Sequence, residues 1–385
     1  MQKYHLIVVG AGNLGAFHAY HALKLGKKVL LLERDSAPKE ATVRNFGQVV
    51  PSGQSLNEWF DYGRKSLKIY NEIQSKTDIT ARKNGSYYLA SDEDELMLLV
   101  EAAYLFAERD YKAKLLTAKD CLKKVDGLRK NYALGGLYFP KELSVEPRLM
   151  IHLVIKFMVE SMGLEYRNNT TVIDCQPRAD LSLVVTADNQ KIFAEKVVIC
   201  SGYDFKTLFP TIFAKSNMSI CKLQMLQTHP QHKLILPGNI LTGLTIRRYD
   251  SFKSCNSFKS IKKTEFHKQY DSFGIHILFK QAHNGSIIIG DSHQYTEINE
   301  NSNLDFGTNN GINELILSEA KRILNLPNWI IDTCWNGYYS KTKDDTIFEQ
   351  NIEQKIYIAT GIGGKGMTTA PGYAQESIET IFEKS

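Results

Sequence analysis

The sequence predicts a mixed α/β fold of two interleaved domains, and two observations carry this prediction. The first is the opening stretch, in which an apolar strand, a glycine-rich turn, a helix and a second apolar strand follow one another. The second is that glycine-rich strand ends recur in the middle of the chain and again near its C-terminus. One domain assembled from distant segments, with a second domain inserted between them, explains this distribution most simply.

The opening stretch contains the most regular pattern in the chain. Residues 6–9 are an apolar, β-branched run, which is typical of a buried parallel strand. A helix is predicted from Asn13 to Leu25, with Gly26 as its C-terminal stop. A second apolar strand at 29–32 then leads directly to the carboxylate of Glu33.

The glycines of the first turn indicate a dinucleotide site. Gly10 permits a tight turn, Gly12 has no Cβ to keep the backbone away from a pyrophosphate, and Gly15 lets the helix lie close to the strand. The free amides at the helix N-terminus attract phosphates, and Glu33 has the spacing of a ribose-binding carboxylate. The motif alone leaves a nicotinamide and a flavin open, with an ordinary glycine-rich turn as the alternative.

Composition excludes several classes of protein. The 385 residues are 43% hydrophobic and 23% charged, which is typical of a soluble globular protein with room for two domains. A net charge of +5 is too small to indicate nucleic-acid binding. No apolar run is long enough to span a membrane, and no signal peptide is evident. Six scattered cysteines without a CxxC pair favour reduced thiols and a cytoplasmic location.

The segments after Glu33 define the rest of the architecture. A polar loop at 35–54 is too long for a simple crossover, and it precedes a strand ending near Ala90 and a helix capped by Ser91 and Asp94. The middle of the chain is predicted to contain a helix closed by Gly163 and then strands at 164–176, 181–188 and 190–202.

The last 170 or so residues mix strands and helices before they return to the opening pattern. The segment 219–332 has aromatic-rich strands, the hairpin signal AHNGSIIIGDS and a helix at 313–325. Residues 355–382 then repeat the order of strand, glycine cluster and amphipathic helix. A glycine cluster this far from the first one favours a single long resident cofactor, and therefore a flavin, over a nicotinamide.

Motifs along the whole chain resemble the FAD-dependent D-amino-acid oxidase/glycine oxidase superfamily. They are GAGNLG with ERD, TVRNFG, the EP before the middle helix, VVICSG and ATGIGGKGMT, in this order. Within the superfamily, VRNFG, CKLQM, IIIGDSH and WNGYY most resemble a bacterial subgroup associated with phosphonate breakdown and with aminophosphonate substrates.

The resemblance implies a Rossmann-like FAD-binding domain of the glutathione-reductase/D-amino-acid-oxidase type and an interleaved mixed-sheet domain. Together with the distribution of glycine-bearing strand ends, it assigns residues 1–85, 145–218 and 333–385 to the FAD-binding domain. Residues 86–144 and 219–332 are assigned to the substrate-binding domain.

The resemblance also implies which residues contact FAD. Glycines of the first turn lie at the pyrophosphate, Glu33 at the ribose, and the last glycine cluster at the carbonyl side of the isoalloxazine. The implied residues are Gly10, Gly12, Asn13, Leu14, Gly15, Glu33, Arg34, Arg44, Asn45, Phe46, Gly47, Val172, Ser201, Gly202, Gly361, Gly363, Gly364, Lys365, Gly366, Met367 and Thr368. The early-loop histidine and C-terminal cysteine that tether flavin in some relatives are absent, so FAD is expected to be non-covalent.

The implied activity is oxidation of the C–H bond beside the amino group of a small substrate that also carries an anionic group. A hydride leaves the α-carbon for flavin N5, and the imine is hydrolysed, with no obligatory side-chain base. Candidate substrate contacts are Arg44, Arg247, Arg248, Tyr249, His293, Tyr338, Tyr339, Lys341 and Lys365. The basic stretch 247–268 is interpreted as either an anion-binding lid or a surface hairpin. His18 and His21 lack further ligands, and no metal is expected.

Several alternatives remain open at this point. The substrate could carry a carboxylate, as for a glycine, sarcosine or D-amino-acid oxidase or dehydrogenase. The chain could be a flavin-bearing subunit of a larger complex, or, less in keeping with the last glycine cluster, a nicotinamide-linked dehydrogenase. The electron acceptor, oxygen or a quinone or another electron-transfer partner, and the oligomeric state are not determined by the sequence.

Overall fold

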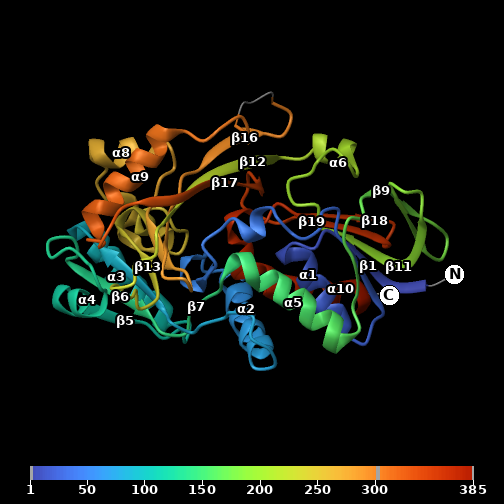
Figure 1. Ribbon diagram of the computed structural model, residues 1–385, viewed down its shortest axis with the longest axis horizontal. Helices are drawn as coiled ribbons and strands as arrows, with labels where there is room; N and C mark the ends of the chain where they lie inside the picture. The colour runs from blue at the N-terminus through green and yellow to red at the C-terminus, as the bar shows by residue number, and fades with distance from the viewer. Residues whose placement is uncertain (1–2, 301–303, 384–385) are drawn as a thin grey trace.

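Two large sheets occupy opposite halves of the molecule (Figure 1). The structure, a computed structural model, describes residues 3–300 and 304–383. An eight-stranded sheet combines segments from the beginning, the middle and the end of the chain, and a nine-stranded sheet combines segments between them. The mixed α/β fold predicted from the sequence is confirmed. Within the described ranges, no helix has the length and apolar content needed to cross a membrane.

The centre of the eight-stranded sheet is parallel. β1 (Lys3–Val9) lies between β2 (Val29–Leu32) and β11 (Lys191–Ile199), and the sheet continues outward to β8 (Glu165–Arg167) and β19 (Ile356–Thr360). Buried side chains from this sheet belong to cores on both of its faces. This explains why its strands are continuous apolar runs in the sequence.

Antiparallel strands complete this sheet at its edges. β9 (Val172–Pro177) and β10 (Ser182–Thr186) form a hairpin that pairs with the first half of β11. β18 (Phe348–Ile352) pairs with β19 at the other edge. The predicted strands of the middle segment are therefore present, with β8 and β9 taking the place of one longer strand.

Four helices pack together on one face of the eight-stranded sheet. α1 (Asn13–Lys24) contacts α10 (Gly366–Glu383) and α5 (Pro147–Met162), and α10 also contacts α2 (Glu58–Gln74). Gly163, in the left-handed conformation, ends α5 as the sequence predicts. The first and last helices of the chain thus lie side by side, with their N-termini at the same end of the sheet (Figure 1).

The nine-stranded sheet is mixed and is organised around a long antiparallel pair. β12 (Met218–Thr228) pairs along its whole length with β17 (Ile331–Thr342). The remaining strands are β4 (Ser86–Ala90), β5 (Lys114–Thr117), β6 (Gly135–Phe139), β13 (Asn239–Leu241), β14 (Leu278–Gln281), β15 (Ile287–Gly290) and β16 (Gln294–Glu297). The predicted hairpin at AHNGSIIIGDS is β14–β15.

Helices cover the outer face of the nine-stranded sheet, while its inner face looks toward the eight-stranded half. α4 (Ala118–Lys124) and α9 (Asn310–Ile323) share an apolar core with the outer face. α3 (Glu93–Ala107) packs in the core that also contains α1, α2 and α10. A small ladder of β3 (Gln48–Val49) and β7 (Leu143–Ser144) joins two of the segments that connect the halves.

The sheet membership of β17 differs from the predicted boundary at residue 333. That boundary assigned residues 333–342 to the FAD-binding domain, whereas β17 pairs with β12 in the nine-stranded sheet. β12 has 11 residues and pairs with nearly all of β17. β17 therefore reaches the half with the eight-stranded sheet only at its C-terminal end, where Lys341 forms a bridge to Ile362. The proposed division into two domains otherwise stays a prediction, and residues 1–2, 301–303 and 384–385 of its ranges lie outside the described residues.

The helix cap predicted at Ser91 and Asp94 is shifted by one residue. Asp92 is the N-cap of α3, and its side chain accepts a hydrogen bond of 2.9 Å from Glu95 N. Glu95 accepts in return from Ser91 N at 2.7 Å. Aspartate accepts as well as serine at this position, so the sequence alone does not distinguish the two caps.

We expect the buried acid Glu142 to make the folded protein less stable as the pH rises from 4.5 toward 7. Its Oε1 accepts from Ser52 N at 2.8 Å and from Tyr111 at 3.2 Å, but its Oε2 has no partner among the described residues. Burial raises the pKa of Glu142 from 4.5 to about 7. The folded protein therefore holds a proton that the unfolded chain releases, and stability present below pH 4.5 is lost as the pH rises toward 7, by about 3 kcal/mol.

Urea unfolding from pH 4.5 to 8 tests this expectation. Glu142→Gln should remove the Glu142 part of the decline, whereas Glu108→Gln, at the exposed end of α3, should keep the wild-type slope. Parallel stability curves for wild type and Glu142→Gln would show that Glu142 does not titrate in this range.

Candidate active site

A cavity of about 550 Å³ lies between the two halves of the molecule. At its nucleotide end it is lined by the first glycine turn, Glu33 and Ser201, and at its histidine end by His276, Asp291 and His293. Most of the residues predicted to contact FAD or substrate are in its wall. The site is therefore built from five parts of the chain. They are the first turn, the early loop (residues 35–54), the end of β11, the β14–β15 hairpin of the nine-stranded sheet with the residues that follow it, and the last glycine cluster (residues 361–366).

The three glycines of the first turn have different functions in the structure. Gly10 has φ +96°, and a Cβ there would lie 2.3 Å from the carbonyl oxygen of Cys200. A Cβ on Gly15 would lie 1.9 Å from the carbonyl oxygen of Gly10. A Cβ on Gly12 would meet only Thr42 Oγ1, at 3.3 Å. The chain itself requires Gly10 and Gly15, whereas Gly12 leaves space on the cavity wall.

Glu33 is positioned at the end of β2 by hydrogen bonds to both carboxylate oxygens. Oε2 accepts from Ala11 N at 2.9 Å, and Oε1 accepts from Asp35 N at 3.0 Å. The residue is 8% exposed and faces the cavity. Each oxygen keeps a further lone pair, so Glu33 can still accept from a ribose hydroxyl.

Two helices begin at the nucleotide end and are joined there. Asn13 Nδ2 donates to Gly366 O at 2.8 Å and thereby connects the first residue of α1 to the first residue of α10. Asn13 Oδ1 and Ser201 Oγ are buried, line the cavity and have no hydrogen-bond partner among the described residues. Two helix N-termini beside unpaired polar oxygens fit a ligand with phosphate and hydroxyl groups.

The other predicted cofactor residues divide into those that line the cavity and those that do not. Arg34, Arg44, Asn45, Phe46, Leu14, Val172, Gly202, Gly363, Gly364, Lys365, Met367 and Thr368 line it. Gly47 and Gly361 do not. A Cβ on Gly47 would lie 2.2 Å from Val145 O, and Gly361 N donates to Ser340 Oγ at 3.1 Å, so both glycines serve the packing around the site.

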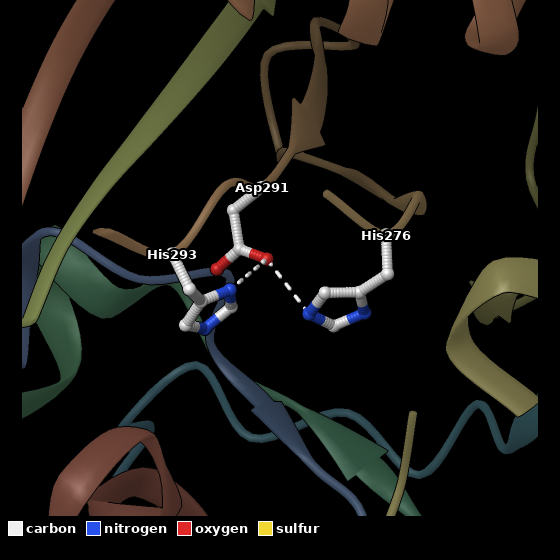
Figure 2. A group of neighbouring side chains, drawn as sticks. All are labelled: His276, Asp291 and His293. Carbon is white, nitrogen blue, oxygen red and sulfur yellow. Dashed lines mark ion pairs between the residues drawn. The ribbon is translucent and has the colours of Figure 1, made fainter. Parts of the chain in front are cut away.

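The histidine end of the cavity contains a trio of His276, Asp291 and His293 (Figure 2). His276 Nε2 lies 2.9 Å and His293 Nδ1 lies 3.8 Å from the same oxygen of Asp291, Oδ1. Burial lowers the pKa of both histidines, that of His293 to about 3, and Arg248 lowers them further. Burial also raises the pKa of Asp291. Neutral rings therefore flank a carboxyl group that is more basic than usual.

Arg248 and Tyr249 adjoin the trio from the segment after α7 (Gly243–Ile246). Arg248 Nη2 donates to Tyr295 at 3.2 Å, and the Tyr249 ring meets the His276 ring edge to face at 5.5 Å. The predicted surface hairpin at 247–268 is wrong, because this stretch contains two short 3-10 helices, Phe252–Ser254 and Asn256–Ser260, and the start of α8 (Glu265–Asp271). Four of its residues, 248–250 and 253, line the cavity.

The remaining candidate substrate residues lie in varied surroundings. Tyr339 is buried beside His293, with ring centroids 6.3 Å apart, while Tyr338 lies near Tyr203, with ring centroids 5.8 Å apart. Both line the cavity, as do Lys341 and Lys365. Arg44 Nη1 donates to Asn336 O at 3.0 Å, which holds the early loop to β17.

Arg247 is the candidate that the structure places outside the cavity. Its guanidinium contacts Glu95 at 2.7 Å and Asp92 at 2.5 Å, and its side chain is 6% exposed. These acids belong to α3 and its cap, about 150 residues earlier in the chain. The sequence offers no local signal for this pairing, which neutralises Arg247 inside the protein.

Comparison with known proteins identifies the family. Residues 5–380 match the family described as "DAO: FAD dependent oxidoreductase". The chain belongs to this family. It is an FAD-dependent oxidoreductase, as the resemblance implies, and its cofactor is FAD.

The relatives cover the chain almost completely. It is 24% identical over 401 residues to the glycine oxidase of Bacillus licheniformis, covering 99% of this chain and 94% of the relative. It is 23% identical to an opine oxidase subunit of Rhizobium meliloti, covering 91% and 86%. The crystal structure of L-proline dehydrogenase from P. horikoshii superposes with a TM-score of 0.80 at 18% identity, covering 100% and 94%, and shows the same fold.

The cavity of this DAO-family chain also contains residues that sequence reasoning missed. Asp291, His276 and Tyr295 are in the wall, as are Asp250 and Lys253. IIIGDSH contained Asp291 as well as His293, and its position directly after a strand was a usable signal. His276 had no such signal, because only the pairing of its backbone with residue 291 brings it to the site.

Two clusters among the described residues have ligand atoms within 4.8 Å of one another, which the sequence did not indicate. One is the trio, and the other is Asp92, Glu95 and His267. Arg247 already occupies the second cluster as a counter-ion. In the first, His293 Nδ1 is 3.1 Å from Gly274 O, and Arg248 adds a positive charge. The expected absence of a metal stays a prediction.

We expect Gly12→Ala and Gly15→Ala to fail in different ways. A Cβ at residue 12 fits the protein but intrudes where the pyrophosphate approaches, so Gly12→Ala should keep the wild-type apoprotein Tm and lose most bound FAD. Gly15→Ala must displace backbone, so the Tm of its apoprotein should fall. Flavin absorbance and thermal melting of stripped protein measure both. Full FAD retention by Gly12→Ala would contradict this assignment.

We also expect acid precipitation to release the flavin into the supernatant. Among the described residues, Cys200 lines the cavity. Burial raises the pKa of its thiol far above the usual range, so no thiolate is present to attack the flavin. Flavin absorbance that stays with the pellet would show a covalent link instead.

Proposed function

We propose that this protein oxidises the C–H bond next to the amine of a small anionic amine. The observation that carries the proposal is Arg248. Its guanidinium lines the histidine end, and no carboxylate of the described residues forms an ion pair with it. A desolvated guanidinium without a partner favours a ligand that brings its own anion.

Three lysines that line the same cavity as Arg248 are already paired with acids. Lys365 pairs with Asp345 and, at 3.3 Å, with Asp250, and Lys341 pairs with Asp345 at 3.3 Å. Lys253 pairs with Asp250 at 2.7 Å. Arg248 therefore differs from these lysines in its availability, although all of them line one cavity.

The proposed roles of the chain's residues follow from their positions. Arg248 holds the anionic group, with the hydroxyls of Tyr249 and Tyr295 as neighbouring donors. The buried trio is next to this anchor and is available to the amine. FAD supplies the hydride acceptor, and the protein contributes orientation of the α-carbon and exclusion of water. The glycine oxidase relative supports this proposal, because glycine is itself a small amine with an anionic group.

Within this class we propose an aminophosphonate as the substrate. The support is the motif resemblance together with a donor set richer than one carboxylate requires. A phosphonate presents three oxygens, and Arg248 lies among Tyr249, Tyr295 and Tyr339. A glycine, sarcosine or D-amino-acid oxidase or dehydrogenase is the alternative, in which the same arginine holds a carboxylate.

Anaerobic bleaching of the flavin tests the substrate class. The panel is 2-aminoethylphosphonate, its N-methyl derivatives, glycine, sarcosine and D-alanine. We expect the aminophosphonates to bleach fastest, because only they engage the whole donor set. Faster bleaching by sarcosine or D-alanine would support the carboxylate alternative, and no bleaching by any of them would contradict the proposed function.

Arg248 itself is tested by substitution. Arg248→Gln should raise the apparent substrate Kd in bleaching experiments about 100-fold, since truncating one partner of a buried charge pair costs about 2–5 kcal/mol. Arg248→Lys should recover part of the loss. Lys341→Gln is the matched control, and its effect should stay within a few-fold because Lys341 is already paired. Equal effects of Arg248→Gln and Lys341→Gln would remove the anchor role.

One relative supports a second candidate from another class. The opine oxidase relative is named as a subunit, so this chain could likewise carry flavin within a complex. Steady turnover by the purified chain with oxygen or a quinone would argue against this candidate and would identify the acceptor.

We propose the cytoplasm as the location, which the six unpaired cysteines support.

A further inference from the structure

We propose that Asp291 is a catalytic residue that accepts the proton of the substrate's ammonium group, and that His276 and His293 position its carboxylate. The inference rests on the proposed function, because it concerns the amine that this function oxidises. It departs from the expectation that no side-chain base is needed.

The backbone brings the trio together and fixes it. His276 N donates to Asp291 O at 3.1 Å, and His293 N donates to Phe273 O at 2.9 Å. Gly274, with φ +58°, permits this approach, since a Cβ there would lie 2.8 Å from both the Cβ and the carbonyl oxygen of His293. The three side chains consequently converge on one point of the cavity wall (Figure 2).

The carboxylate of Asp291 has an acceptor site left open. The residue is 6% exposed, and Oδ1 is buried without a partner of normal hydrogen-bond geometry among the described residues, although His276 Nε2 is 2.9 Å away. The outer ring nitrogen of His276, Nδ1, is 3.2 Å from Thr245 Oγ1, while His293 Nδ1 is closer to Gly274 O, at 3.1 Å, than to Asp291. An unpaired buried acceptor on a cavity wall points to a ligand that donates.

An ammonium group is the donor that the reaction brings. Amines of this kind are mostly protonated at neutral pH, but hydride can leave the α-carbon only when the nitrogen lone pair is free. The step is R–NH₃⁺ with Asp–COO⁻ giving R–NH₂ with Asp–COOH, so one N–H bond breaks, one O–H bond forms and no oxidant is involved. Arg248, on the same end of the cavity, holds the anionic group and thereby orients the ammonium toward Asp291.

The groups that face Asp291 suit this role. Burial, the largest influence, raises the pKa of Asp291, while His293 and Arg248 lower it. The hydroxyls of Tyr249 and Tyr339 and the thiol of Cys221 also face the trio, and burial raises the pKa of each, which keeps them protonated. Among these groups, Asp291 is the carboxylate on the cavity wall that can take a proton from a ligand.

The test is the pH dependence of anaerobic bleaching by the best substrate of the panel, from pH 6 to 10. Wild type should bleach with little change across the lower part of this range. Asp291→Asn should follow the fraction of neutral amine in solution, falling about tenfold for each pH unit below the amine pKa and approaching wild type at high pH. Asp250→Asn, which removes another cavity carboxylate, should keep the wild-type profile shape.

Two further measurements separate this role from a structural one. Binding of an amine-free acid, acetate or methylphosphonate, followed by the flavin spectrum, should be unchanged in Asp291→Asn and weakened in Arg248→Gln. Wild-type bleaching should be unaffected by EDTA. An Asp291→Asn profile equal to wild type, or bleaching that EDTA abolishes, would overturn the proposal. If no substrate bleaches the flavin at all, the proposed function fails first.

Discussion

The contact on which the structure depends is the close approach of the first glycine turn to segments from far along the chain. Gly10 lies against the carbonyl of Cys200, and Asn13 holds the start of α10 through Gly366. The second of these contacts joins residues separated by 353 positions, so the strand ends of β1, β11 and β19 meet at one edge. The nucleotide end exists only because this edge is assembled, and the order of the segments follows from the requirement that all three reach it.

The inserted segments supply the other end of the cavity and its charge pattern. Around Lys365, lysines and aspartates pair with one another, while the trio and Arg248 remain without such compensation. Burial then acts in opposite directions on the two kinds of group. It keeps the histidines neutral and makes Asp291 more basic, yet it cannot neutralise an arginine. At the histidine end, Arg248 is therefore a fixed positive charge close to a carboxyl group, Asp291, whose pKa is raised by burial.

The sequence predicted the features that depend on local patterns. The first strand–turn–helix–strand unit, the C-terminal cap at Gly163 and the β14–β15 hairpin were all visible in short stretches. Features that depend on distant partners were not. The sequence suggested a pocket position for Arg247, because the acids that neutralise it lie about 150 residues earlier, on α3 and its cap. His276 had no motif, because its position follows from the pairing of its backbone with residue 291. Within the basic stretch 247–268, a cap between Thr264 and His267 begins α8, and a count of basic residues does not reveal it.

If Arg248 is the anchor and Asp291 the proton acceptor, as we propose, their positions would allow this fold to change substrate without changing cofactor. Arg248 follows α7 and Asp291 follows β15, so both belong to the nine-stranded half. The glycine turn, Glu33 and Asn13 belong to the other half. A neutral amine without an anion would leave Arg248 desolvated and unpaired, and an anion without an amine would leave Asp291 unsatisfied. Under the proposed function, selection of a molecule with both groups would be a property of the nine-stranded half, and it could be altered there without changing Glu33 or the first glycine turn.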